Sequence, residues 1–225
     1  MAIRSIQLPD GRTIEIDEWL HWPTFSVIEF AAASKVNLRA FSYVQGNPVS
    51  SQGLAIRTAT ESDTNQVVKQ QTNYDESILV YDVTYEPFAL SDAILVREQG
   101  NLNLAPAPLI LSTNLHRLQR DLMVELYVGA KQTKPQFRCP MSFVGQAVGA
   151  PAWGPGPGPA AGFNISYGTG GYPTPENARR LELPVYIESA MTFYLKVYSN
   201  AAISDLTQDM SLRWYLDGLK RRPVG

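Results

Sequence analysis

The sequence predicts an all-β protein of the β-sandwich type, with one or two short helices and long loops. Runs rich in aromatic and β-branched residues recur along the 225 residues. Turn-forming residues separate these runs, and their number, about seven to nine, suits two sheets packed face to face. Only 18% of the residues are charged, while 44% are hydrophobic. We therefore expect one domain over residues 1–225 with extensive buried surface, part of it between subunits.

The N-terminal residues 1–17 are expected to form a β-hairpin. Two apolar runs flank Pro9-Asp10-Gly11, in which proline sets φ and Asp-Gly tolerates left-handed turn positions. The segment that follows contains Trp19, Trp22 and a proline, so it should break regular structure and serve as an anchor. The pattern of residues 26–43 fits either a helix or a strand. Residues 45–77 are polar and predict a long loop or an ordered arm.

The middle of the chain predicts several strands and one helix. Residues 77–88 (SILVYDVTYEPF) form the strongest strand pattern, which Pro87 ends or kinks. Residues 93–97 are a weaker strand candidate. A short helix is expected at residues 112–121, where Leu115 and Leu118 share a face. Two strands should follow, at 122–128 and 137–144, with Pro140 interrupting the second.

A loop rich in glycine and proline occupies residues 145–175. Such a composition forms neither a helix nor an inner strand. Four aromatic residues are interleaved with it, namely Trp153, Phe163, Tyr167 and Tyr172. Because a flexible linker has no use for four aromatic rings, part of the loop is expected to dock on a surface, either of its own domain or of a neighbour.

Three strand-like runs end the sequence. LELPVYIES and MTFYLKVYS meet at Ser189-Ala190 and predict a hairpin, in which Phe193, Leu195 and Val197 share one face. SLRWYLDG should then close the sheet. This number and arrangement of strands fits a β-sandwich or a jelly roll.

The residues that usually carry chemistry are few. His21 and His116 lie far apart, without a partner at metal-ligand spacing, and Cys139 has no second cysteine to pair with. Glu61 and Asp63 lie in an oxygen-rich stretch, residues 58–66, that faintly resembles a cation-binding loop but lacks the required order of ligands. We therefore predict no cofactor, no metal, no catalytic residue and no enzymatic activity. A β-rich hydrolase with a distant carboxylate pair remains an alternative.

The net charge of −2 provides no overall attraction to nucleic acid or to anionic lipid. A small basic cluster at the C-terminus includes Arg221 and Arg222. Its simplest interpretation is a solubilising tail, or an arm that pairs with an acidic surface of a neighbouring subunit. Neither a secretory signal nor an apolar run long enough to span a membrane is visible, so synthesis in a host cytoplasm is expected.

The C-terminal run LPVYIESAMTFYLKVYSNAA, with SLRWYLDGLKRRPVG after it, resembles the closing strands of jelly-roll capsid proteins of bacteriophages. In that family a strand pair leads to a last strand, a turn such as Leu-Asp-Gly, and a tail ending in Arg-Pro-Val. Residues 51–88 are similar to the early part of such proteins. The resemblance implies a structural subunit of a virus particle, a tailless phage being one candidate source, and it gives no catalytic residue.

These observations predict a structural virion protein, a major or minor capsid subunit that assembles with copies of itself and with other virion proteins. Contact with the genome or with an internal membrane is left open, and no small-molecule substrate is expected. The candidate subunit contacts are Trp19, Trp22, Trp153, Phe163, Tyr167, Tyr172, Arg221 and Arg222. The alternative is a carbohydrate- or receptor-binding β-sandwich module of a phage particle, in which Trp153, Tyr167 and Tyr172 would stack on sugar rings.

Overall fold

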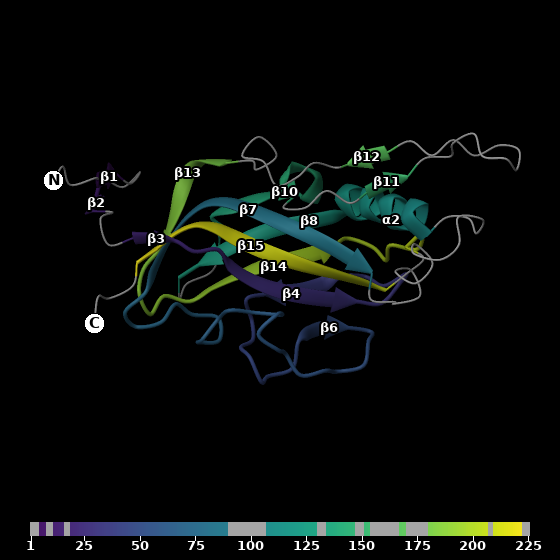
Figure 1. Cartoon of the computed structure of the whole chain (residues 1–225), viewed down its shortest axis with the longest axis horizontal. Helices are drawn as coiled ribbons and strands as arrows, with labels where there is room; N and C mark the ends of the chain where they lie inside the picture. The colour runs from purple at the N-terminus through teal and green to yellow at the C-terminus, as the bar shows by residue number, and fades with distance from the viewer. Residues whose placement is uncertain are drawn as a thin grey trace, which may run out of the picture.

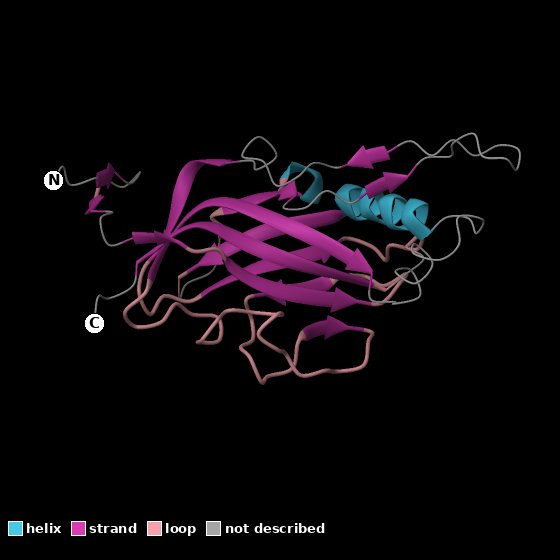
Figure 2. Cartoon of the chain, in the orientation of Figure 1, coloured by secondary structure: helices cyan, strands magenta, loops and turns pink. Residues whose placement is uncertain are grey.

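The computed structural model describes residues 5–7, 11–15, 19–89, 107–129, 134–146, 151–153, 167–169, 180–206 and 209–221. Within these ranges the chain forms two main β-sheets, two further strand pairs and one α-helix (Figure 2). The all-β class predicted from the sequence is therefore confirmed. Among the described helices, none has the length and apolar character needed to cross a membrane.

The larger sheet has seven strands in the order β10-β7-β15-β4-β6, with β13 also paired to β7 and β3 also paired to β15 (Figure 1). The strands are β3 (Trp19–His21), β4 (Thr24–Phe30), β6 (Ser50–Gln52), β7 (Ser77–Ala89), β10 (Gly145–Gln146), β13 (Arg180–Ile187) and β15 (Met210–Arg221). The long strand β15 lies between β4 and β7 and is antiparallel to both. The short strands β6 and β10 are added in parallel.

The smaller sheet has four antiparallel strands in the order β5-β14-β8-β9. They are β5 (Asn37–Ala40), β8 (Leu122–Val128), β9 (Phe137–Pro140) and β14 (Phe193–Ser199). The two further pairs are β1 (Ser5–Gln7) with β2 (Thr13–Glu15), and β11 (Pro151–Trp153) with β12 (Tyr167–Thr169). The first of these pairs lies where the sequence predicts a hairpin.

One hydrophobic cluster joins the inner faces of both sheets. In β14 the side chains of Phe193, Leu195 and Val197 point into it, as the alternation of the sequence predicts. From the larger sheet, Tyr85 and Trp214 meet with ring centroids 5.4 Å apart. Burying each large apolar side chain stabilises the fold by about 1.5–3 kcal/mol, so this shared core holds the two sheets together.

The helix α2 (Ala107–Asp121) begins five residues before the predicted start at residue 112. Pro108 lies in its first turn, where a missing backbone N–H costs nothing, so the proline does not delay the helix. Leu115 and Leu118 are buried in the shared core. The Gln119 amide also donates a hydrogen bond of 2.6 Å to the hydroxyl of Tyr85, which fixes the helix to the larger sheet.

The expected hairpin between the last strands is wrong. β13 pairs with β7 in the larger sheet, whereas β14 pairs with β5 and β8 in the smaller one. The turn at residues 189–190 therefore carries the chain from one sheet to the other. Likewise, β15 does not close a sheet but lies near the centre of the larger one. Alternating apolar residues predict a strand in each case, but they do not specify its partner.

Other expected elements differ in detail. Residues 26–43 contain two strands, β4 and β5, and no helix. Pro140 ends β9, after which Met141–Phe143 form a 3-10 turn instead of a continued strand. Pro87 neither ends nor breaks β7, which continues to Ala89 beside β15. The candidate strand at 93–97 lies outside the described residues.

Candidate functional site

Residues 53–76 form an ordered arm, here called the 53–76 arm, within the stretch predicted as a long polar loop. Three isolated bridges join it to the rest of the chain: Ser26 with Thr64, Pro48 with Thr58, and Gln71 with Thr192. The Asn65 side chain adds two hydrogen bonds to β4 and its approach, one from the Phe25 N–H at 2.9 Å and one to the Pro23 carbonyl at 2.7 Å. The arm is therefore bound to β4 of the larger sheet near Thr64 and to the start of β14 in the smaller sheet near Gln71.

A cluster of charges, here called the Arg57 cluster, holds the arm against β4. Its members are Arg57, Glu29 and Asp63. The guanidinium donates from Nε to Glu29 Oε1 at 3.0 Å and to both carboxylate oxygens of Asp63 at 2.7 and 2.8 Å. Both acidic residues are buried, and Glu29 is only 2% exposed. Since buried carboxylates need a paired charge, Arg57 joins a residue of β4 to a residue of the arm.

Hydrogen bonds from the arm complete the cluster. Burial by itself raises the pKa of Asp63, but hydrogen bonds from Arg57 and from the backbone and hydroxyl of Thr60 outweigh it and lower that pKa to about 2. Beneath the cluster, the hydroxyl of Tyr43 donates to the Val27 carbonyl at 2.6 Å. Burial raises the pKa of Tyr43 to about 12, so its hydroxyl remains a donor at neutral pH.

The Arg57 cluster accounts for the oxygen-rich stretch that the sequence singles out as a faint cation loop. The carboxylate of Asp63 binds the chain's own guanidinium, and the exposed Glu61 lies outside the cluster. No group of three or more His, Cys, Asp or Glu side chains with metal-binding spacing occurs among the described residues. The stretch thus contributes Asp63 to an ion pair with Arg57, which shapes the arm.

Large apolar side chains project from the arm into solvent. Ile56 is 79% exposed, Val67 is 70% exposed and Tyr74 is 78% exposed. The other exposed large apolar residues in the described part of the chain are Leu20, Trp22, Phe143 and Leu183. The arm thus combines a firmly bound base with three large apolar side chains that are exposed to solvent.

A second organised surface lies on the outer side of the smaller sheet. Register places Lys196 opposite both Arg39 of β5 and Glu125 of β8, while Glu125 lies opposite Arg138 of β9. These four residues form one row across all four strands. Tyr127, Tyr194 and Tyr198 occupy neighbouring positions on the same side, because side chains two residues apart share a face. These seven residues are here called the outer face.

Glu125 is the centre of the outer face. Its carboxylate accepts hydrogen bonds from the hydroxyls of Tyr127 at 2.8 Å and Tyr198 at 2.9 Å. Arg138 Nε lies 3.2 Å from it and Lys196 Nζ lies 3.9 Å from it. Burial, with the neighbouring carboxylate, raises the pKa of Tyr127 to about 12, so the phenol stays protonated and donates. The Glu125 charge is therefore neutralised by its neighbours.

Aromatic and cationic side chains pack together around this centre. The rings of Tyr127 and Tyr194 stack with centroids 5.0 Å apart. The guanidinium of Arg39 lies 4.4 Å from the Tyr194 centroid, and the ammonium of Lys196 lies 4.5 Å from that of Tyr198. Such contacts hold long side chains in one conformation. The outer face is therefore pre-organised, with the Arg138 side chain still 60% exposed.

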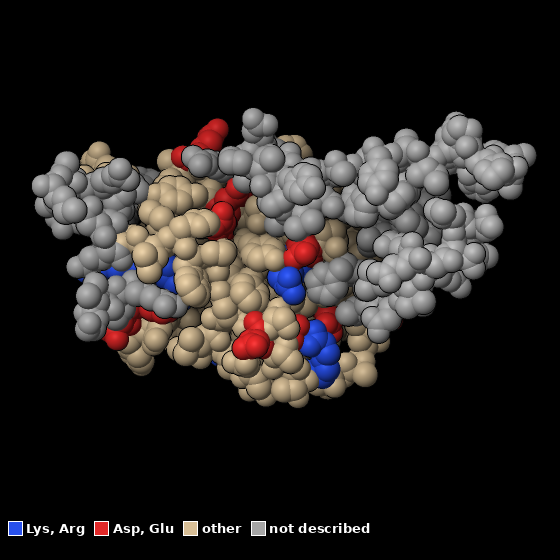
Figure 3. Space-filling view, viewed as in Figure 1, with Lys and Arg blue, Asp and Glu red and all other residues tan. Residues whose placement is uncertain are grey.

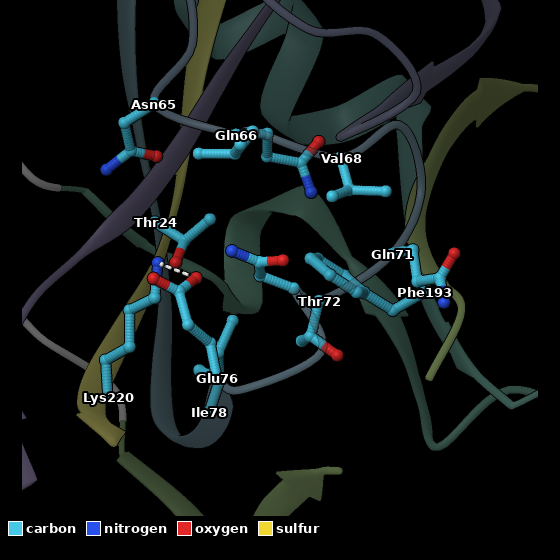
Figure 4. Close-up of a pocket in the computed structure, with 12 residues that line it drawn as sticks. Thr24, Asn65, Gln66, Val68, Gln71, Thr72, Glu76, Ile78, Phe193 and Lys220 are labelled. Carbon is cyan, nitrogen blue, oxygen red and sulfur yellow. Dashed lines mark ion pairs between the residues drawn. The ribbon is translucent and has the colours of Figure 1, made fainter. Parts of the chain in front are cut away.

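A small pocket lies where the arm meets the ends of β4, β14 and β15 (Figure 4). Lys220 and Glu76 form an ion pair of 2.7 Å at its wall, and the buried amide of Gln66 also lines it. The pocket leaves room for about one water molecule. It is thus too small for an organic substrate, and its ion pair serves to fix the base of the arm.

Five of the eight predicted contact residues lie within the part of the chain that the structure describes. Trp19 is only 8% exposed and packs against Tyr186, so it contacts its own chain. Trp22 is 39% exposed, and Arg221 is exposed at the end of β15. Trp153 of β11 lies opposite Tyr167 of β12 in register.

The remaining predicted contacts, Phe163, Tyr172 and Arg222, lie outside the described residues. Of the histidines, His21 pairs with Asp217 at 2.8 Å beside the β15 bulge, and His116 is exposed on α2. Cys139 is partly buried in β9. The structure brings none of these three residues together. Neither the Arg57 cluster nor the outer face was predicted from the sequence, because their members come from distant segments.

Among the described residues visible in Figure 3, basic and acidic side chains lie in small groups between uncharged residues.

Comparisons with protein-family models, with curated proteins and with solved structures find no match to this chain. The function is therefore argued from the two organised surfaces, the 53–76 arm and the outer face.

Proposed function

We propose that this protein is a structural subunit, without enzymatic activity, that assembles into the shell of a virus particle. The observation that carries the proposal is the 53–76 arm, which is fixed at its base by buried charges and displays Ile56, Val67 and Tyr74 to solvent. A contact segment that is already ordered loses little conformational entropy when it binds. Apolar side chains on such a segment therefore favour association of subunits.

The two-sheet body supports the same proposal. We infer a jelly roll as the finer description of the fold, since two sheets enclose a shared core and strands distant in sequence lie side by side. A body of this kind presents its arms and loops at its margins, where many weak contacts between identical copies add up to a stable shell. The partners in this proposal are copies of the protein and other virion proteins, and the location is the virion.

The test is self-association of the purified protein, followed by sedimentation and electron microscopy. The wild-type chain should form particles or large oligomers as its concentration rises. The substitution Ile56→Asp on the arm should raise the protein concentration needed to form these oligomers at least tenfold, because it puts a charge into an apolar contact. The matched control is Leu183→Asp on β13, a residue 65% exposed and away from the arm. A wild-type protein that stays monomeric at high concentration, alone and with its virion partners, would count against the proposal.

A second candidate function follows from the β11–β12 pair. Trp153 and Tyr167 lie directly opposite in its register, so two aromatic residues suited to stacking on sugars occur at one place on the backbone. This arrangement favours the glycan- or receptor-binding module as the alternative. Binding to a glycan array that is lost on Trp153→Ala, with assembly unaffected, would support it over the shell subunit.

A further inference from the structure

The 53–76 arm and the outer face carry opposite charge. The arm contains two basic residues, Arg57 and Lys69, and four acidic ones, which gives it a net charge of −2. Two of the acidic residues, Glu61 and Asp75, are exposed. The outer face has three cations and one carboxylate, a net charge of +2. One copy of the chain therefore presents both halves of a complementary pair.

We propose that the arm of one copy docks on the outer face of a second copy. The inference rests on the proposed assembly function and names its contact. The apolar side chains Ile56, Val67 and Tyr74 provide the buried centre, while Glu61 and Asp75 lie against Arg39 and Arg138. Tyrosine and arginine, together with tryptophan, are enriched in the energetic centres of protein interfaces. The outer face offers three tyrosines and two arginines already held in position.

The state of the tyrosine rings favours a protein partner over a nucleic acid. Single-stranded nucleic acids bind by stacking bases on open ring faces. Here the face of Tyr194 stacks on Tyr127 or lies under Arg39, and Tyr194 is only 8% exposed. The hydroxyls of Tyr127 and Tyr198 both donate to Glu125. The surface therefore presents fixed ring edges and cations, which suit an acidic and apolar protein segment.

The contact uses two different patches of each copy. Such a head-to-tail contact leaves an arm and an outer face open at the two ends of every oligomer. Further copies therefore add until a ring closes, or continue as a filament if the rotation between copies does not close. The association is also expected to weaken as salt is added, because exposed charges bring the two patches together.

Complementary charge reversal tests this contact directly. The first variant, with Arg39→Glu and Arg138→Glu, combines the wild-type arm with an acidic outer face. The second variant, with Glu61→Lys and Asp75→Lys, combines a basic arm with the wild-type outer face. For each variant alone, the protein concentration needed for assembly should rise at least tenfold, because its arm and its outer face now carry charge of the same sign. An equimolar mixture should assemble again, because the basic arm meets the acidic face and the wild-type arm meets the wild-type face.

Controls separate this contact from folding and from the general proposal. Circular dichroism should show that all variants fold, and charge reversal at Lys35 or at Glu182, both exposed elsewhere, should leave assembly unchanged. The proposed contact is wrong if the wild-type protein assembles and each variant assembles equally well, or if the mixture of variants does not regain assembly. The shell proposal is unaffected by either result. If wild-type protein never assembles, the shell proposal itself fails. The outer face would instead be a nucleic-acid surface if substitutions of Arg39 and Arg138 abolished binding of single-stranded DNA and left assembly unchanged.

Discussion

Arg57 and Asp63 face each other in a bidentate ion pair, with the two guanidinium Nη atoms 2.7 and 2.8 Å from the two carboxylate oxygens. The pair closes a short loop within the arm, and Glu29 of β4 binds the same guanidinium from the body. One side chain therefore determines both the shape of the arm and its attachment. The contact surface proposed for assembly depends on this cluster, although no member of the cluster needs to touch a partner.

Removing Arg57 should strongly destabilise the fold. In Arg57→Ala the buried carboxylates of Glu29 and Asp63 lose their counter-charge, which is expected to cost about 3–5 kcal/mol. Urea denaturation measures the loss. The comparison variant is Arg120→Ala, because the Arg120 side chain is exposed and the loss of its pair with Asp121 should have a much smaller effect. Equal losses in the two variants would show that the Arg57 cluster does not hold the arm.

Acid should weaken the protein through Asp63. Folding lowers the pKa of this carboxyl from 3.8 to about 2, so the folded state favours the ionised form. A carboxyl with a lowered folded-state pKa contributes stability above its unfolded-state pKa, here about 2 kcal/mol. That contribution is lost as the pH falls from about 4 to about 2. Denaturation curves across this range should show a smaller pH dependence in Asp63→Asn than in the wild type, and an unchanged dependence would contradict the assignment.

Gly218 should tolerate no larger residue. It lies at the bulge where β15 shifts register against β7, and a Cβ atom there would lie 2.0 Å from the carbonyl oxygen of Leu79. Since that oxygen belongs to the backbone, Gly218→Ala should cost about 3 kcal/mol. Gly46→Ala provides the control, because Gly46 has a φ of +84° but no atom within 4 Å of an added Cβ. Gly46→Ala should therefore cost only about 1 kcal/mol. Thermal denaturation of the two variants measures this difference in stability.

Replacing Glu125 should be visible in the ionisation of its tyrosine neighbours. Burial is the main cause of the raised pKa of Tyr127, and the hydrogen-bonded carboxylate of Glu125 adds to it. In Glu125→Gln the pKa of Tyr127 should therefore fall from about 12 part of the way toward 10. Absorbance or NMR titration measures this change. Glu182→Gln, at an exposed position on β13, should leave the tyrosine titration unaltered, and a fall in both variants would argue against the Glu125 centre.

Much of the secondary structure could be predicted because it depends on local patterns. The strand at 77–88 and the inward-facing Phe193, Leu195 and Val197 follow from residue type and alternation. The partner of a strand does not follow from its own residues. A tight turn near Ala190, with its φ of 55°, suits a hairpin and a crossing between sheets equally well. The expected β13–β14 hairpin was wrong for this reason.

The candidate site was harder to predict than the fold. Glu29 and Arg57 are 28 residues apart, and nothing in either segment indicates that they bind. The outer face includes a row of four residues on four strands, and this row can be identified only when the register of the strands is known. The residues are Arg39, Glu125, Arg138 and Lys196. The oxygen-rich stretch at 58–66 did signal an unusual site. The sequence did not indicate that Asp63 would bind a guanidinium of the same chain, because no local pattern pairs it with Arg57.

The central position of β15 has a consequence for synthesis on the ribosome. β4 and β7 leave the exit tunnel long before residues 210–221, which later separate them in the sheet. At typical translation rates this interval lasts on the order of ten seconds. Throughout it, both nascent strands expose unpaired edges and apolar faces, so early misfolding or capture by chaperones is expected until the last long strand inserts.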